Sequence, residues 1–211
     1  MRILSIDTSS ATASVAIVEE GKLIEEKFSE DQKTHSEKIV PLVDELLKTT
    51  NLTLNDIDEF CVCTGPGSFT GIRIGVALVK GMAQALNKKV VGVSSLLGLI
   101  NSSKSENVCA IIDALHENVY AQYIIDGNYS EPDCINIYDL IKQLKNKKIT
   151  FVGNGILKYR DLLEKELDCN FEDNVLPKAS DIAIFACENN INFKEPYEII
   201  PVYLRKPQPE R

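Results

Sequence analysis

The chain has 211 residues, of which 44% are hydrophobic and 26% charged, the balance of an ordinary globular protein with room for a substantial core. Its formal net charge is -8, and strong RNA binding by one protein needs basic groups that displace counterions from phosphates, so the composition argues against a solitary RNA binder. No stretch approaches the ~20 apolar residues that cross a bilayer, and Asp7 interrupts the apolar start too early for a signal peptide, so we expect no membrane association and a cytoplasmic protein.

The first hundred residues predict the order strand, strand, strand, helix, strand, helix, strand. Short apolar or alternating runs bounded by turn residues indicate the strands, and apolar residues three and four apart indicate the helices. The turn at 19–21 links two strands of a meander. The predicted strands are 2–7, 12–18, 22–28, 58–63 and 90–93, and the predicted helices are 36–48 and 68–86.

A polar segment at 101–107 predicts a linker, after which a similar series begins. The strand 108–113 ends on a carboxylate, as 2–7 does. The topology therefore predicts an α/β fold, a tandem duplication of two βββαβα lobes over 1–100 and 101–211, as in actin-like and sugar-kinase-like (ASKHA) proteins; such an analogy licenses no chemistry by itself. The other predicted strands are 118–125, 134–138 and 149–152, the helices are 139–145, 156–167 and 180–188, and the tail 201–207 is extended, either packed on the body or projecting to a partner.

The six cysteines include no CxxC pair, so neither a zinc ribbon nor a thioredoxin-like motif is predicted. Cys61 and Cys63 share one face of a strand, and Cys109 lies in another strand. We expect buried, reduced thiols that pack as small apolar side chains.

The segment from Gly65 to Gly75 lies between a buried strand and a helix. Its glycines permit a sharp turn, and Ser68 can cap the helix by accepting a backbone N–H. A helix N-terminus favours anions, so a phosphate site is one interpretation of this segment. However, a Walker A loop needs a glycine followed by a lysine at the positions where Thr70 and Gly71 stand. The GxGxxG motif also fails, because Thr70 occupies the position of its third glycine. The dedicated phosphate-binding motifs are therefore not matched.

Gly71 and Gly75 lie one turn apart on one face of that helix, which Leu78 and Met82 continue. Each glycine costs about 1 kcal/mol against alanine, so something must offset the cost. Close packing on the protein's own sheet is one explanation, and a helix–helix interface with another subunit is the other.

Several short motifs along the chain belong together. They are Asp7-Thr8-Ser9, Thr34-His35-Ser36-Glu37 with Pro41, Gly65–Gly75, Val93-Ser94-Ser95-Leu96, Asp113-Ala114 with Val119-Tyr120, Gly153-Asn154-Gly155 and Tyr203-Leu204-Arg205. With these motifs the chain resembles the TsaB (YeaZ) family. The similarity covers nearly the whole chain and is densest over residues 1–100, where the Gly65–Gly75 segment is its most specific part.

The resemblance implies a two-lobed actin-like protein that pairs with TsaD, the related subunit that transfers threonylcarbamoyl to the tRNA adenosine beside the anticodon. It also implies the ATPase TsaE as a further partner, contact with tRNA through the complex, and a homodimer when the chain is alone. The expected interface comprises the helices of the first lobe, 36–47 and 69–82. Its expected residues are His35, Ile39, Leu42, Val43, Leu46, Phe69, Gly71, Ile72, Gly75, Leu78 and Met82.

The resemblance also implies that the catalytic relative holds a metal with two histidines, four residues apart, just after the fifth strand. Residues 93–100 of this chain contain no histidine, and leucines occupy the place of the ligands. The only histidines are His35 and His116, far apart in sequence, and both are interpreted as solvent-exposed. We therefore expect no catalytic residue, no metal and no cofactor.

The main alternative is an actin-like phosphotransferase or nucleotide hydrolase. Asp7, Thr8 and Asp113 are its candidate nucleotide-binding residues, because both carboxylates end the first strand of a lobe. The glycine expected after Thr8 is missing, so any adenine nucleotide at the cleft or subunit interface would be weakly held. A peptidase ranks last, because the sequence offers neither a metal pair nor a credible Ser/His/Asp set.

Overall fold

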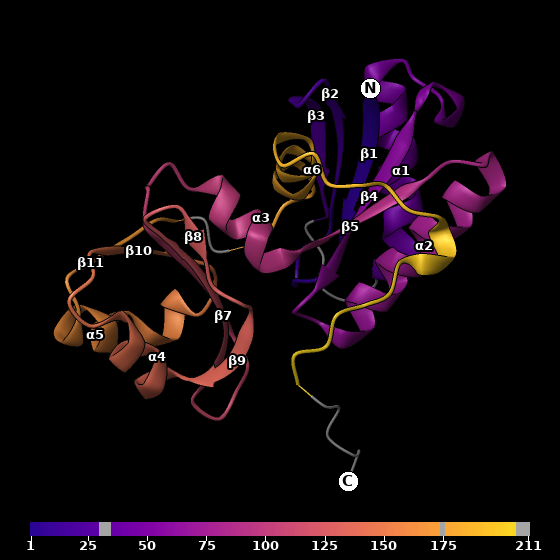
Figure 1. The fold of residues 1–211 in the computed structure, drawn as a ribbon. Helices are drawn as coiled ribbons and strands as arrows, with labels where there is room; N and C mark the ends of the chain where they lie inside the picture. Colours follow the sequence, from indigo (N-terminus) through magenta and orange to yellow (C-terminus); the bar gives the residue numbers. More distant parts are fainter. Residues whose placement is uncertain (30–34, 174–175, 206–211) are drawn as a thin grey trace, which may run out of the picture.

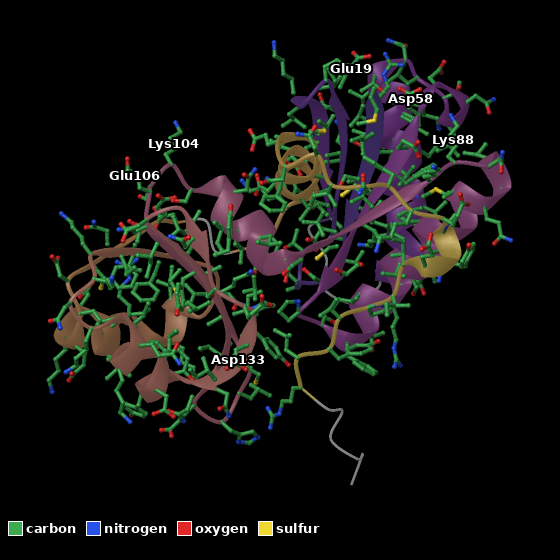
Figure 2. The ribbon with its side chains drawn as sticks, viewed as in Figure 1. Glu19, Asp58, Lys88, Lys104, Glu106 and Asp133 are labelled. Atoms are coloured by element: carbon green, nitrogen blue, oxygen red, sulfur yellow. The ribbon has the colours of Figure 1, made fainter. Side chains whose placement is uncertain are left out.

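The computed structural model describes residues 1–29, 35–173 and 176–205. They form two lobes, each built on its own β-sheet, and two helices lie between the lobes (Figure 1). Charged side chains such as Glu19, Asp58 and Lys88 lie at the outer end of the first lobe (Figure 2).

The first lobe contains a five-stranded sheet in the order β3-β2-β1-β4-β5. β1 pairs antiparallel with β2 and parallel with β4, so the meander continues into a parallel half. The strands are β1 (Arg2–Asp7), β2 (Ser14–Glu19), β3 (Lys22–Phe28), β4 (Glu59–Gly65) and β5 (Val90–Ser94).

Helices cover both faces of this sheet, which explains why its central strands are buried along nearly their whole length and are mostly apolar. Side chains alternate along a strand, so Phe60 and Val62 face α1 (His35–Thr50) and α2 (Phe69–Leu86), whereas Cys61 faces α6 (Ala179–Glu188). Burial raises the pKa of the Cys61 thiol to about 12, so this thiol is protonated at neutral pH. All six cysteines are free.

The second lobe repeats this arrangement. Its sheet has the order β11-β10-β6-β7-β8, with β9 also paired to β7, and β6 runs antiparallel to β7 and parallel to β10. Its elements are β6 (Val108–Asp113), β7 (Asn118–Ile125), β8 (Asn128–Tyr129), β9 (Asp133–Asn136), α4 (Ile137–Leu144), β10 (Ile149–Val152), α5 (Ile156–Glu166) and β11 (Cys169–Phe171).

Two predictions of local structure are wrong. The strand predicted at 134–138 ends at Asn136, because its side chain accepts a hydrogen bond from the Tyr138 amide and caps α4. A further helix, α3 (Ser95–Ser102), covers residues that were not predicted to be helical and part of the predicted linker. The Ser94 side chain caps it by accepting from the Leu96 amide. Two short 3-10 helices, η1 (Leu54–Asp56) and η2 (Pro196–Glu198), complete the described elements.

The packing crosses the division predicted at residue 100 in both directions. Helix α3 follows the first sheet in sequence, but its Leu96 and Leu99 pack in a cluster with β6 and β10 of the second lobe. Helix α6 comes late in the sequence, yet Ile182 and Phe185 pack on the first sheet. The two helices touch each other between the lobes, as Figure 1 shows.

The last described residues return to the body of the protein. Ile199 is buried in the core of the first lobe, and the Val202 amide donates to the Thr64 carbonyl oxygen at 2.8 Å. Of the two possibilities for the tail, the described part up to Arg205 packs on the body. No described helix is long and apolar enough to cross a membrane.

Candidate functional site

A cleft of about 600 Å³ lies where the ends of the first strands of the two lobes approach each other. The loop after β1 and the start of α2 form one wall, and the end of β6 with Asn154 forms the other. Its described lining consists of Ser9, Ser10, Ala11, Ser36, Gly67, Ser68, Thr70, Gly71, Ile74, Ile112, Asp113, Tyr120, Asn154 and Pro177. The lining is rich in hydroxyl groups and contains neither lysine nor arginine among the described residues.

Thr8 fills the space beside the two glycines that the sequence analysis singled out. A Cβ atom on Gly71 would lie 2.0 Å from the Thr8 carbonyl oxygen, and one on Gly75 would lie 2.4 Å from Thr8 Oγ1. The Thr8 hydroxyl also donates to the Gly71 carbonyl oxygen at 2.7 Å. The structure therefore supports the first explanation, close packing within the chain, for both glycines. Thr8 is held against α2 and is absent from the lining of the cleft.

Asp7 ends β1 and is fully buried. Its Oδ1 accepts hydrogen bonds from the amide and the hydroxyl of Ser9, at 2.7 and 2.8 Å. This carboxylate therefore stiffens the loop after β1, and it is absent from the lining of the cleft.

Asp113 ends β6 and lines the cleft. Its Oδ1 lies 3.1 Å from Lys158 Nζ and accepts from the Leu115 amide at 3.2 Å. Its own amide donates to Asn154 Oδ1 at 3.0 Å, which ties the segment 153–155 into a turn at the start of α5. The carboxylate thus already has a cationic partner within the chain, in a partly exposed ion pair.

These contacts do not fit a tightly held metal–nucleotide. Such a ligand needs cations or open backbone amides around its phosphates, whereas the described lining is free of basic side chains. At the start of α2, the Ser68 amide donates to the Ser9 carbonyl oxygen and the Ser68 hydroxyl accepts from the Gly71 amide. The protein itself therefore uses two of the amides that a phosphate would require.

The histidines lie on different lobes. His35 begins α1, although its side chain lies outside the described part, and His116 lies in the tight turn between β6 and β7. Among the described residues, no group of three or more His, Cys, Asp or Glu side chains could hold a metal ion.

Most residues expected at the subunit interface lie inside the protein. Phe69 is exposed, Leu78 and Met82 are half-buried, and the His35 side chain lies outside the described residues. The others are buried in the first lobe, so they cannot touch a partner directly: Ile39, Leu42, Val43, Leu46, Gly71, Ile72 and Gly75. The helical spacing in the sequence had identified the inner face of α1 and α2.

The outer face of α2 carries the feature that the sequence analysis missed. Gly81 is exposed, and a Cβ atom placed there would meet nothing within 4 Å. Ala77 and Ala85, one turn away on either side, are exposed too, and Leu78 and Met82 flank them. A third glycine in a helix with only two charged residues was the signal that could have found this face.

Comparison with known proteins identifies the family. The family model described as TsaD, tRNA N6-adenosine threonylcarbamoyltransferase, matches residues 23–202. A relative from Escherichia coli K12, named tRNA threonylcarbamoyladenosine biosynthesis protein TsaB, is 33% identical over 97% of this chain and 95% of its own length. This chain belongs to the TsaB (YeaZ) family. A TsaB protein from Bacillus subtilis 168 is 28% identical over 100% of this chain and 96% of its own.

Solved structures agree with the TsaB family and with the predicted fold. A protein from Pseudomonas aeruginosa, described as similar to peptidase YEAZ, superposes with a TM-score of 0.81 at 26% identity over 97% of this chain and 99% of its own. Component A of (R)-2-hydroxyglutaryl-CoA dehydratase from Acidaminococcus fermentans reaches 0.56 at 11% identity, over 91% of this chain and 100% of its own, which shows the fold alone. The predicted actin-like, sugar-kinase-like architecture is confirmed.

Proposed function

We propose that this chain is a non-catalytic partner subunit of TsaD and is required for threonylcarbamoyladenosine formation in tRNA. The match to TsaB proteins along nearly the whole chain supports the role in tRNA modification. The TsaD family model matches residues 23–202 of this chain, so the chain and the proposed partner TsaD have related architectures.

The observation that carries the proposal is the outer face of α2. A solvent-exposed helix ordinarily places charges on its outer side, but the 18 residues of α2 include only Arg73 and Lys80. An exposed glycine in a helix interior costs about 1 kcal/mol against alanine, and no described residue lies close enough to Gly81 to require it. A small, apolar face of this kind suits the close approach of a helix from another subunit.

Helix α1 extends this face. Val40 is 54% exposed although it is apolar, and Pro41 beside it is exposed as well. Both helices pack on the same side of the first sheet, so their outer sides belong to one surface. We call Val40, Pro41, Ala77, Leu78, Gly81, Met82 and Ala85 the α1–α2 face.

Helix α3 supports the non-catalytic part of the proposal. It directly follows β5, where the resemblance places the metal-binding histidines of the catalytic relative. Leu96 and Leu99 of this helix are fully buried and pack against β6 and β10. Apolar side chains cannot serve as metal ligands, so this position contributes to the core.

The proposed complex also includes TsaE, and tRNA reaches this chain mainly through the other subunits because the net charge here is -8. In the absence of TsaD, the same α1–α2 face would pair two copies of the chain.

One observation favours a second candidate, a nucleotide-dependent phosphotransferase or hydrolase. The cleft of about 600 Å³ lies between the strand ends that carry Asp7 and Asp113, with room for a small ligand. The ion pair between Asp113 and Lys158 makes this the weaker candidate. Turnover of magnesium-ATP by the isolated chain, lost in Asp7→Asn, would favour it.

The first experiment measures the affinity of TsaD for variants of the α1–α2 face, by calorimetry. Gly81→Arg places a long charged side chain where a partner helix would approach, so we expect at least a hundredfold loss of affinity, the scale of ~3 kcal/mol for a disrupted interface centre. Leu157→Arg is the matched control, because Leu157 is 77% exposed on α5 of the second lobe. Equal affinities for Gly81→Arg and wild type would refute the assignment of this face.

A further inference from the structure

The last described segment, 199–205, starts on the first lobe, as Figure 1 shows. Ile199 is only 5% exposed in the core of that lobe, and Lys80 Nζ donates to its carbonyl oxygen at 3.0 Å. The Val202 amide then donates to the Thr64 carbonyl oxygen near the C-terminal end of β4. The segment is therefore anchored along α2 and β4 before it leaves the lobe.

Tyr203 is the last residue of the segment held by the first lobe. Its ring lies 4.9 Å from the Phe69 ring, between centroids, and its hydroxyl accepts from Arg73 Nε at 2.9 Å. The Arg73 guanidinium also lies 3.6 Å from the centroid of the Phe69 ring. Phe69 and Arg73, both in the first turns of α2, thus contact Tyr203 and hold its ring in place.

The next two residues are held by the other lobe. Leu204 packs against the cluster that contains Ile112 of β6. Arg205 donates from its guanidinium to the Ala114 carbonyl oxygen at 2.8 Å. Ala114 directly follows Asp113, which lines the cleft, so the chain passes from one wall of the cleft to the other within three residues.

Elsewhere the lobes meet through α3 and α6. A Cβ atom on Gly98 would lie 2.7 Å from Ile182 Cγ2, so the two helices cross in close contact. The Tyr129 and Phe185 rings form a further edge-to-face contact at 6.4 Å. The two lobes therefore share a tightly packed crossing and, at the cleft, a small contact that involves one leucine and one arginine.

We propose that Tyr203–Arg205 is a latch that sets the opening of the cleft between the two lobes. Closed, it ties the start of α2 to the turn after β6. Open, it frees the lobes to move about the α3–α6 crossing, because the contacts of Leu204 and Arg205 are too few to resist reversible release. This inference concerns the motion of the chain itself and does not depend on the proposed partner.

The test uses the full chain with a fluorophore pair on non-natural residues at Lys22 of the first lobe and Glu131 of the second, both exposed. In Leu204→Ala/Arg205→Ala, we expect the population with a long interlobe distance to rise about tenfold, since a hydrogen bond from a charged donor and the packing of a partly buried leucine are both lost. Tyr203→Phe keeps the ring and loses only the bond from Arg73, so it should show a smaller rise. Arg160→Ala is the matched control, because Arg160 lies over the Phe171 ring of the second lobe, away from the segment.

Hydrogen exchange on the same variants distinguishes release of the latch from general loosening. We expect faster exchange at residues 112–120, where the Ala114 amide bonds to the Asn118 carbonyl oxygen, with unchanged exchange in β4. Unaltered distances and exchange in the double variant would overturn the proposal. An equal rise in exchange throughout the chain would overturn it too, because the two residues would then serve stability alone.

Discussion

The three glycines inside α2 show how one residue type serves two purposes in one helix. Gly71 and Gly75 face Thr8 of the same chain, at distances that leave no room for a methyl group. Gly81 faces open space. The first two are therefore requirements of the fold, and the third is a candidate requirement of assembly.

Alanine substitution separates the two roles. Gly71→Ala should lower the free energy of unfolding by about 3 kcal/mol, because the new methyl group would clash with a backbone oxygen that cannot move without shifting β1. Gly81→Ala should raise it by up to ~1 kcal/mol, because alanine is the better helix former at an exposed position. Urea unfolding of both variants checks the pair, and a Gly71→Ala protein as stable as wild type would contradict the packing described here.

The sequence revealed the glycines but not their neighbours. Thr8 lies 63 residues before Gly71, and nothing in the helical spacing tells whether its own chain or another covers a face. For the same reason, residues such as Ile39 and Leu46 were expected at a partner surface, although they fill the core. Asp7 and Asp113 were correctly predicted at strand ends, whereas the bonds from Ser9 and the ion pair with Lys158 required the structure.

At the scale of elements, the crossing of α3 and α6 carries a half-buried acid. Asp181 lies in the first turn of α6, close to Gly98 of α3. Burial raises the pKa of this carboxyl to about 7; Lys178 opposes the shift, and Glu26 and Asp7 add to it. The folded protein therefore holds a proton here that the unfolded chain releases near its ordinary value of 3.8.

This shift predicts a dependence of stability on pH. Because the folded-state pKa is raised, the contribution of Asp181 is fully present below about pH 4 and is lost as the pH rises through 7. Asp181→Asn removes the titrating group. The free energy of unfolding of this variant minus that of the wild type should therefore increase by on the order of 2 kcal/mol between pH 5 and pH 8. Asp161→Asn, at an exposed site on α5, is the control. Unfolding curves at several pH values check this, and parallel profiles for Asp181→Asn and wild type would refute it.

Helix α3 also marks the limit of prediction at this scale. Strong alternation and long apolar faces identified most strands of the two sheets and helices such as α1 and α2, but not the short strands β8 and β11. Helix α3 has eight residues, two of them serine, and no charge, so its local sequence does not resemble an amphipathic helix. Burial on both sides, against the second sheet and α6, stabilises it, and those contacts come from distant parts of the chain.

At the scale of the whole molecule, the two lobes repeat one topology, but the side chains around their shared cleft make different contacts. The loop after β1 of the first lobe and the end of β6 of the second lobe both line the cleft. The loop after β1 packs on α2, Asp113 pairs with Lys158, and leucines of α3 fill the core. The proposed consequence is a body that contributes a surface, the α1–α2 face, to a reaction carried out by its partner.

The most direct measurement of this claim is the threonylcarbamoyladenosine content of tRNA after incubation with TsaD, TsaE and a threonylcarbamoyl donor, with and without this chain. We predict that modification needs this chain in stoichiometric amount and that the chain alone produces none. With the Gly81→Arg variant in place of the wild-type chain we predict no modification, whereas the Leu157→Arg variant should support it as the wild type does. Full modification by TsaD and TsaE without the chain, or modification by the chain alone, would contradict the account.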